Sequence, residues 1–129
     1  MFIKNKKGFY EFPELTRLGL LNAVSTKAYG NMAYKYGPKE EVDVHREKFT
    51  SDVGIDFSKT AQHGLVHGTK VQIVDKSGIY DNVDGLITNN ENIALWVMTG
   101  DCAPIILFDP VKKVVGLVHS GWRGAVGHQ

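Results

Sequence analysis

The chain has 129 residues, of which 43% are hydrophobic and 22% are charged, a composition typical of a folded domain rather than of a disordered segment. Its formal net charge of +1 gives no electrostatic reason to expect nucleic acid or an anionic membrane as a partner. No apolar run approaches the roughly 18 residues that a membrane-spanning helix needs, and the N-terminus lacks the apolar segment of a secretory signal. The only cysteine, Cys102, cannot form an internal disulfide. We therefore expect one domain, residues 1–129, in the reducing cytoplasm.

The first half of the chain contains one strong helix pattern. Residues 22–27 resemble a short strand with a polar end, and the glycine- and proline-containing segment 29–38 predicts a loop. Segment 39–53 predicts a helix, because acidic residues crowd its first turn and apolar residues recur at heptad-like spacing. Gly54 is expected to end this helix.

The second half is rich in short strand patterns. Segments 69–75 and 85–88 predict strands, and the polar segments 76–84 and 89–92 predict turns. Because these strands are mixed with helices and partly joined by hairpins, the fold class is expected to be mixed α/β (α+β), with a mixed sheet.

The densest apolar sequence predicts a central antiparallel hairpin. Its two strands are the apolar runs 104–108 and 114–118, separated by an Asp-Pro turn with following lysines. Both faces of this hairpin are apolar, so both need to be covered, which indicates β-sheet layered between other elements.

The register of the hairpin decides whether it carries a site. A two-residue loop at Pro110–Val111 would place Asp109 opposite Lys112 and Cys102 opposite His119. Directly opposed residues have Cβ atoms about 4.5–5.5 Å apart and point to the same face. A loop with an odd number of residues would send the two side chains to opposite faces.

A thiolate and two imidazoles form the leading candidate site: Cys102, His119 and His67. This donor set suits Zn²⁺, and three protein ligands leave a fourth position open, as in catalytic zinc sites. Copper would also accept these ligands. The alternative is a buried cysteine with two incidental histidines. His63 would replace His67 as a ligand only if this segment were helical, and His45 and His128 lie outside the set.

The same atoms allow nucleophilic catalysis instead. In that case Cys102 attacks, His119 acts as the base and Asp101 lies alongside. An unpaired Asp101 carboxylate would disfavour a free thiolate, whereas a metal ion would ionise the thiol, so the metal interpretation is favoured. Arg123, after a glycine-rich turn, is a candidate phosphate-binding residue, together with Ser25 and Lys27; ordinary surface roles are the alternative.

Several sequence blocks together resemble one family. They are Ser25-Thr26-Lys27, His45-Arg46, His67-Gly68, Asp84-Gly85-Leu86-Ile87-Thr88, Thr99-Gly100-Asp101-Cys102-Ala103-Pro104 and His119-Ser120-Gly121-Trp122-Arg123-Gly124. Their order is similar to that of the laccase-domain family, also called multicopper polyphenol oxidoreductases and later purine nucleoside phosphorylases. The resemblance spans the chain from about residue 22 to the C-terminus.

The resemblance implies a zinc site on His67, Cys102 and His119 and a mixed α/β fold with sheets between helices. It also implies phosphorolysis of adenosine, inosine or guanosine, with adenosine deamination and methylthioadenosine cleavage as companion activities. Peptidoglycan editing, cysteine hydrolysis, copper polyphenol oxidation and a non-catalytic metal-binding fragment are the alternatives. The expected partners are therefore a nucleoside and phosphate.

Some positions depart from the family pattern. Lys27 stands where the family has arginine, His45 where it has asparagine, and Gly100 where it has alanine. Family members also continue for roughly half a domain beyond this chain. We therefore expect the chain to be the N-terminal portion of a laccase-type domain. Its doubly apolar hairpin is expected to be covered by self-association, giving a homodimer, or by a missing C-terminal portion.

Overall fold

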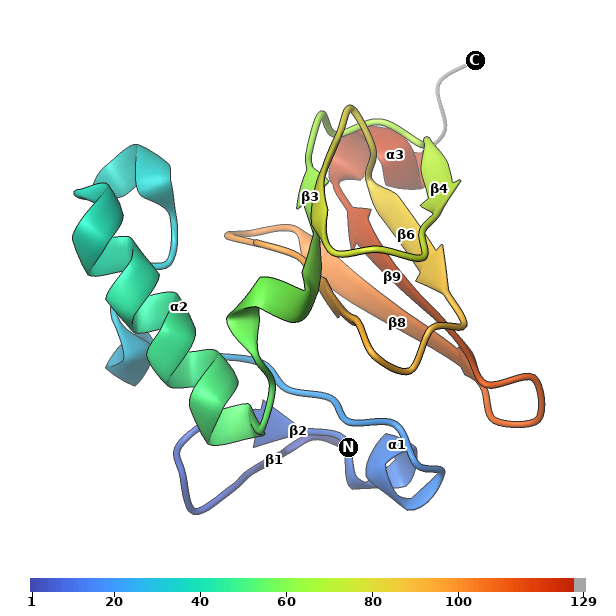
Figure 1. Cartoon of the computed structure of the whole chain (residues 1–129). Helices are drawn as coiled ribbons and strands as arrows, with labels where there is room; N and C mark the ends of the chain where they lie inside the picture. Colours follow the sequence, from blue (N-terminus) through green and yellow to red (C-terminus); the bar gives the residue numbers. More distant parts are fainter. Residues whose placement is uncertain (127–129) are drawn as a thin grey trace. The chain divides into compact units, whose positions relative to one another are not determined.

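A computed structural model describes residues 1–126 of the chain, so His128 lies outside the described residues. The fold is mixed α/β, as the sequence predicts, and the chain forms two compact units, Met1–Phe57 and Ser58–Gln129 (Figure 1). That the whole chain acts as one domain stays a prediction. Within the described residues, no helix is long and apolar enough to cross a membrane.

The first unit is built around one long helix. Two short strands, β1 (Ile3–Lys4) and β2 (Tyr10–Glu11), pair antiparallel. They are followed by α1 (Pro13–Arg17), two 3-10 turns, η1 (Lys27–Tyr29) and η2 (Tyr34–Tyr36), and α2 (Lys39–Val53). The predicted helix 39–53 is confirmed at both ends. Gly54 ends it in the left-handed conformation, with φ 93°, and its N–H donates to the carbonyl oxygens of Thr50 and Ser51.

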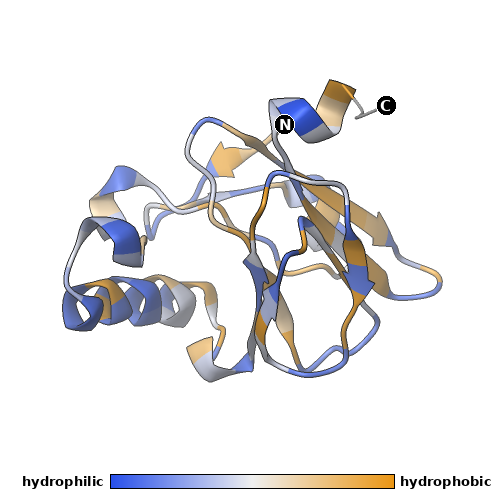
Figure 2. Ribbon diagram, turned by 90° about the horizontal axis from the view of Figure 1, so that it is seen from above, coloured by the Kyte–Doolittle hydropathy of each residue, from blue (hydrophilic) through white to orange (hydrophobic). Residues whose placement is uncertain are grey.

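One face of α2 forms the core of the first unit. Val42, Phe49 and Val53 recur at helical spacing and are buried, while Figure 2 shows hydrophilic colour over much of the rest of the helix. The Phe49 ring meets the ring of Tyr29 edge-on at 5.1 Å and that of Phe9 at 6.1 Å. Burial of these aromatic rings contributes to the stability of the unit, together with the buried aliphatic residues of α2.

The strand predicted at residues 22–27 is wrong. Only Val24 pairs, in an isolated bridge with Tyr10. Side chains on either side of it bind the backbone of the segment around Tyr10: Asn22 Oδ1 accepts from the Phe12 N–H at 2.7 Å, and the Thr26 hydroxyl donates to the Gly8 carbonyl at 2.9 Å. Such bonds compete with strand pairing, and the chain then turns into η1.

The second unit contains two sheets. The three-stranded sheet is parallel, with order β5 (Gly78–Asp81), β3 (Thr60–Gly64), β7 (Ala94–Trp96). The four-stranded sheet is mixed, with order β4 (Val71–Ile73), β6 (Gly85–Thr88), β9 (Val114–Ser120), β8 (Ala103–Asp109). The remaining elements are the 3-10 turn η3 (Phe57–Lys59) and α3 (Trp122–Val126).

The strands predicted at 69–75 and 85–88 are confirmed as β4 and β6, and the hairpin as β8 and β9 (Figure 1). The prediction of turns over 76–84 misses β5, which lies at the centre of this segment and pairs with β3. The ring of Tyr80 packs against the buried cluster of this unit, formed by Ala61, Val74, Val83 and Leu86. Apolar packing of this kind overrides a polar local sequence.

The predicted hairpin register is wrong by two residues. Asp109 lies opposite Val114 and Pro104 opposite His119, so the loop has four residues, 110–113. The Asp109 carboxylate accepts the N–H groups of Val111 and Lys112, both at 2.9 Å, which removes these donors from the strand ladder. Because a shift of two preserves the alternation of side chains, every residue of the hairpin keeps its predicted face.

Candidate metal centre

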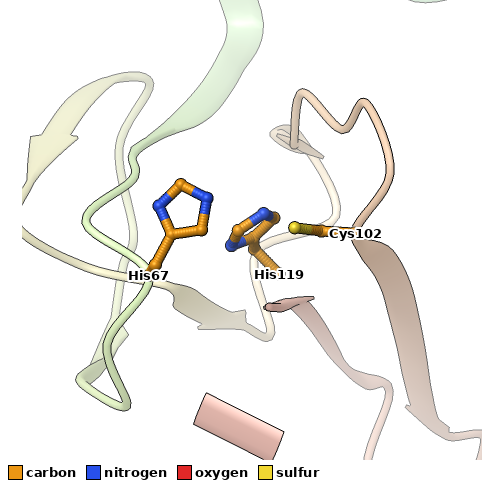
Figure 3. A group of neighbouring side chains, drawn as sticks. All are labelled: His67, Cys102 and His119. Atoms are coloured by element: carbon orange, nitrogen blue, oxygen red, sulfur yellow. The ribbon is translucent and has the colours of Figure 1, made fainter. Parts of the chain in front are cut away.

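Three side chains from separate segments converge in the second unit. His67 lies in the loop after β3, Cys102 directly precedes β8, and His119 lies on β9. Their candidate ligand atoms, one nitrogen from each ring and the Cys102 Sγ, all lie within 4.8 Å of one another. Figure 3 shows the His119 ring between the other two side chains. The sequence interpretation grouped these three residues, and the structure brings them together.

The sheet fixes two members of this group. His119 is only 4% exposed, and its backbone N–H donates to the Asp84 carbonyl at 2.7 Å. Its ring meets that of His67 nearly perpendicularly, with centroids 4.9 Å apart. Cys102 is half-buried and lies one residue before the Ala103–Ser120 pair that begins the β8–β9 ladder. It therefore lies near His119 without being directly opposite it, contrary to the predicted pairing.

The third member lies on a loop with an unusual backbone. His67 is exposed and has a φ of 59°, in the left-handed region that non-glycine residues rarely adopt. Sparsely populated backbone conformations persist where surrounding contacts hold them, and they cluster at functional sites.

Gly121 leaves the space among the three side chains open. A Cβ at this position would lie 3.1 Å from His67 Cδ2, 3.6 Å from His119 Cε1 and 3.7 Å from Cys102 Sγ. A larger residue would therefore occupy the space into which the three ligand candidates point. Gly124 is constrained by a second close approach, since a Cβ there would lie 2.8 Å from the Gly68 carbonyl oxygen.

A buried carboxylate, Asp84, supports the centre from the strand side. Its Oδ1 lies 3.0 Å from His119 Nδ1 and accepts the His67 N–H at 2.9 Å. Its Oδ2 accepts the N–H groups of Gly68 at 2.8 Å and Val66 at 3.4 Å. Burial acts to raise the pKa of this carboxyl, but the hydrogen bonds, that from Gly68 foremost, outweigh it, so the pKa lies below its ordinary value. The group is therefore an ionised carboxylate at neutral pH.

Sequence reasoning did not assign a role to Asp84, although the residue belongs to one of the blocks that carry the family resemblance. An acidic residue directly before a buried strand pattern is a usable signal, because burial of a carboxylate requires partners. The spacing in sequence gave no indication of which partners these are. Loop 66–68 and His119 are distant from Asp84 in sequence, and the pairing of strands in the sheet brings them next to it.

His63 is not a ligand in this arrangement. It lies on β3, which confirms that its segment is not helical. Its Nδ1 lies 2.9 Å from the Trp96 carbonyl oxygen and its Nε2 lies 2.9 Å from the Leu117 carbonyl oxygen. Both ring nitrogens are thus engaged with backbone groups of β7 and β9, and this histidine joins the two sheets of the unit.

The other residues proposed from sequence lie outside the cluster. Asp101 is exposed and precedes Cys102 in the chain. Arg123 is exposed on α3, with its guanidinium 4.8 Å from the centroid of the Trp122 ring. Ser25 and Lys27 belong to the first unit, so a phosphate site shared by these residues and Arg123 stays a prediction.

The donor set of the cluster fits a metal ion. One thiolate and two imidazoles are ligands that Zn²⁺ and copper both accept. Their mutual separations of 4.8 Å or less and the open space at Gly121 match a single ion held in common. These three residues are therefore a candidate metal site with one ion per chain.

The sequence comparisons agree with the resemblance. Residues 16–128 match the family model described as multi-copper polyphenol oxidoreductase laccase. A mouse relative, the purine nucleoside phosphorylase LACC1, is 29% identical over 114 residues, covering 86% of this chain and 26% of the relative. A purine nucleoside phosphorylase of Deinococcus radiodurans is 29% identical over 119 residues, covering 85% and 47%. Purine nucleoside phosphorylase ORF3 of Streptomyces griseus is 37% identical over 89 residues, covering 66% and 36%.

The structural comparisons show the same fold. YlmD from Geobacillus stearothermophilus matches with a TM-score of 0.68 and 27% identity, over 75% of this chain and 40% of that protein. The YfiH protein of Bacillus licheniformis matches with a TM-score of 0.71 over 94% and 52%, at 18% identity. The chain thus spans about a quarter to about half the length of these relatives.

Proposed function

Because the chain belongs to the multi-copper polyphenol oxidoreductase laccase family, we propose that it is part of a zinc-dependent purine nucleoside phosphorylase. The observation that carries the proposal is the convergence of His67, Cys102 and His119 within 4.8 Å. The activity named for the curated relatives supplies the substrate class, purine nucleosides. Adenosine, inosine and guanosine are the proposed substrates, with adenosine deamination and methylthioadenosine cleavage as companion activities.

Zinc is the proposed ion. Three ligands of nitrogen and sulfur with one open position are typical of catalytic zinc sites, and zinc bound there supplies Lewis-acid chemistry. Copper accepts the same ligands, but one centre with three ligands does not provide the several coppers that four-electron reduction of oxygen requires. Oxidation of polyphenols is therefore expected to be weak.

The chain's own residues are proposed to bind and orient the substrates. Phosphorolysis breaks the bond between C1′ of the ribose and the purine nitrogen and forms a bond from C1′ to a phosphate oxygen, and the leaving purine gains a proton. Arg123 is proposed to hold the phosphate through charge-assisted hydrogen bonds, and Ser25 and Lys27 of the first unit stay predicted phosphate-binding residues. Asp101, next to the ligand Cys102, is proposed to take part in the proton transfer.

Release of hypoxanthine from inosine tests this function. We expect release that requires inorganic phosphate and stops when zinc is removed by a chelator. Release without phosphate would indicate hydrolysis instead. A chain that binds zinc and releases no hypoxanthine would be a non-catalytic metal-binding portion of a longer protein.

A second candidate function is hydrolysis by a cysteine nucleophile, and the contact between Asp84 and His119 favours it. A nucleophile, a base and a carboxylate that orients the base are the parts of a catalytic triad, and Cys102, His119 and Asp84 supply these three types. One sulfur cannot serve both functions at once. Alkylation of Cys102 by iodoacetamide separates them: full protection by stoichiometric zinc supports the metal centre, and rapid alkylation with zinc present supports the nucleophile.

A further inference from the structure

We propose that Asp84 is a positioning residue that fixes both histidines of the centre, through the ring of His119 and through the backbone of His67. This inference rests on the proposed metal function for its purpose. The contacts that carry it lie entirely among residues of this chain.

The backbone of Asp84 is itself held on two sides. The residue directly precedes β6, at the start of the four-stranded sheet. Its N–H donates to the Lys70 carbonyl at 3.0 Å, and its own carbonyl accepts the His119 N–H at 2.7 Å. The side chain is 2% exposed. The sheet therefore sets the position of the carboxylate, and the carboxylate in turn holds the neighbouring loop 66–68 in place.

The carboxylate fills a concave group of backbone donors. Three successive N–H groups, those of Val66, His67 and Gly68, point to its two oxygens at 3.4, 2.9 and 2.8 Å. Successive N–H groups around a left-handed residue form an anion-binding nest, and His67, with its φ of 59°, is the left-handed residue here. By accepting these N–H groups, the side chain of Asp84 stabilises the backbone conformation from which the His67 ring reaches the centre.

The same carboxylate selects the tautomer of His119. Both oxygens of the Asp84 side chain accept backbone N–H groups, Oδ1 from His67 and Oδ2 from Gly68, so the side chain acts as an acceptor here. The hydrogen between Asp84 Oδ1 and His119 Nδ1, which are 3.0 Å apart, therefore belongs to Nδ1. A neutral ring that carries its hydrogen on Nδ1 has its lone pair on Nε2. That nitrogen is then ready to coordinate an ion, which is how carboxylates commonly orient histidine ligands.

The two contacts share one oxygen and so act together. Asp84 Oδ1 accepts both from the His67 backbone and from the His119 ring. The neutral amide introduced by Asp84→Asn cannot reproduce this pattern. If the amide oxygen faces the two histidines, the NH₂ group meets the N–H groups of Gly68 and Val66, and if the NH₂ group faces the histidines, the Nδ1–H of His119 is opposed.

The tautomer of His119 in the metal-free wild-type chain is the first test, and it needs no variant. Long-range ¹H–¹⁵N NMR spectra of the chain with all zinc removed should show His119 at neutral pH with its hydrogen on Nδ1. A ring that carries its hydrogen on Nε2, or that exchanges rapidly between both forms, would overturn the proposal. This outcome does not depend on whether the chain is a phosphorylase.

Zinc affinity is the second test. In Asp84→Asn we expect zinc to bind roughly 10–100-fold more weakly, the range typical when a group that orients a metal ligand is removed. Thr88→Val is the matched control, because Thr88 is also buried on β6 and its hydroxyl accepts the Asn90 N–H at 3.0 Å, away from the centre. It should keep wild-type zinc affinity at a similar loss of thermal stability.

The outcomes separate the two proposals. Wild-type zinc affinity in folded Asp84→Asn would overturn the positioning role and leave the metal centre intact. Absence of zinc binding in the wild type would overturn the metal function, and the His119 tautomer would still decide the role of Asp84. If Asp84→Asn does not fold, the wild-type spectrum decides alone.

Discussion

The two compact units use their acidic side chains in different ways. In the first unit, Asp43 and Asp52 pair with lysines one helical turn earlier, Lys39 and Lys48, and all four groups are partly or largely exposed on α2. In the second unit, Asp84 is buried, and its carboxylate binds three backbone N–H groups of loop 66–68 and the ring of His119. Exposed helical ion pairs contribute little to stability because solvent screens them, whereas a buried carboxylate dictates the position of every group that donates to it.

The difference shows that charge alone does not mark a functional site. The first unit carries several acidic and basic residues that stabilise a helix surface. The second unit brings a thiol and two imidazoles together with one buried carboxylate behind them. The following predictions test this contrast, starting with the largest expected effect.

Cys102→Ala should abolish zinc binding, because it removes the only thiolate from a centre of three ligands. Elemental analysis after gel filtration should find one zinc ion per wild-type chain and almost none in the variant, with the circular dichroism spectrum retained. His45→Gln is the control, since His45 lies on α2 in the first unit with its Nδ1 on the Asn31 carbonyl. Full zinc occupancy in Cys102→Ala would show that other residues bind the ion.

Phe49→Ala should lower the free energy of unfolding by about 3–5 kcal/mol, the usual cost of removing a buried phenylalanine ring. The ring is 7% exposed and contacts Phe9 and Tyr29 edge-on. Urea titration followed by tyrosine and tryptophan fluorescence measures the change. A loss below about 1 kcal/mol would show that the apolar face of α2 is not the core of the first unit.

Gly121→Ala should weaken zinc binding about tenfold, or about 1.4 kcal/mol, because the new methyl group would lie 3.1 Å from His67 Cδ2 and press the ring out of place. Gly116→Ala is the matched control on β9, where the nearest atom to an added Cβ is Ile87 Cγ1 at an ordinary 3.6 Å. Competition with a chromophoric chelator measures both. Equal affinities for the two variants would contradict the role assigned to the space at Gly121.

The exposed face of β8 should cause self-association, as the sequence analysis predicts. This strand lies at the edge of its sheet, with Ile105 42% and Leu107 58% exposed. Sedimentation velocity should show a species larger than the monomer that increases with concentration, and Leu107→Lys should reduce it, because charges on edge strands oppose pairing. A wild-type chain that stays monomeric at all concentrations would contradict this prediction.

Asp52→Asn should have the smallest effect, and the effect should depend on pH. Hydrogen bonds, first from Lys48 and then from Tyr29, lower the pKa of Asp52 below its ordinary value. Its stabilising contribution is therefore present above the unfolded-state pKa of about 4 and is lost as the pH falls through the lower folded-state value. At pH 7 the melting temperature of the variant should be slightly lower than that of the wild type. The difference in melting temperature should vanish well below pH 4.

Elements whose signals are local could be predicted from the sequence. Acidic residues at the start, apolar spacing and a terminal glycine fixed helix 39–53, because capping and helical periodicity act within a few residues of the chain. The apolar runs 104–108 and 114–118, with an Asp-Pro turn between them, indicated the strands of the central hairpin, and the order of the His67, Cys102 and His119 blocks indicated the family. The register was not fixed, because the Asp109 carboxylate extends the loop by holding two N–H groups.

The groups that support the centre could not be predicted in this way, because they come together through sheet pairing. β5 forms because Tyr80 packs on a cluster assembled from several strands, and no local pattern reports that packing. Asp84, loop 66–68 and His119 are separated along the chain by up to 53 residues and meet because β6 pairs with β9. A buried carboxylate must find donors wherever the fold places them, so its partners follow from the sheet and not from its neighbours in sequence.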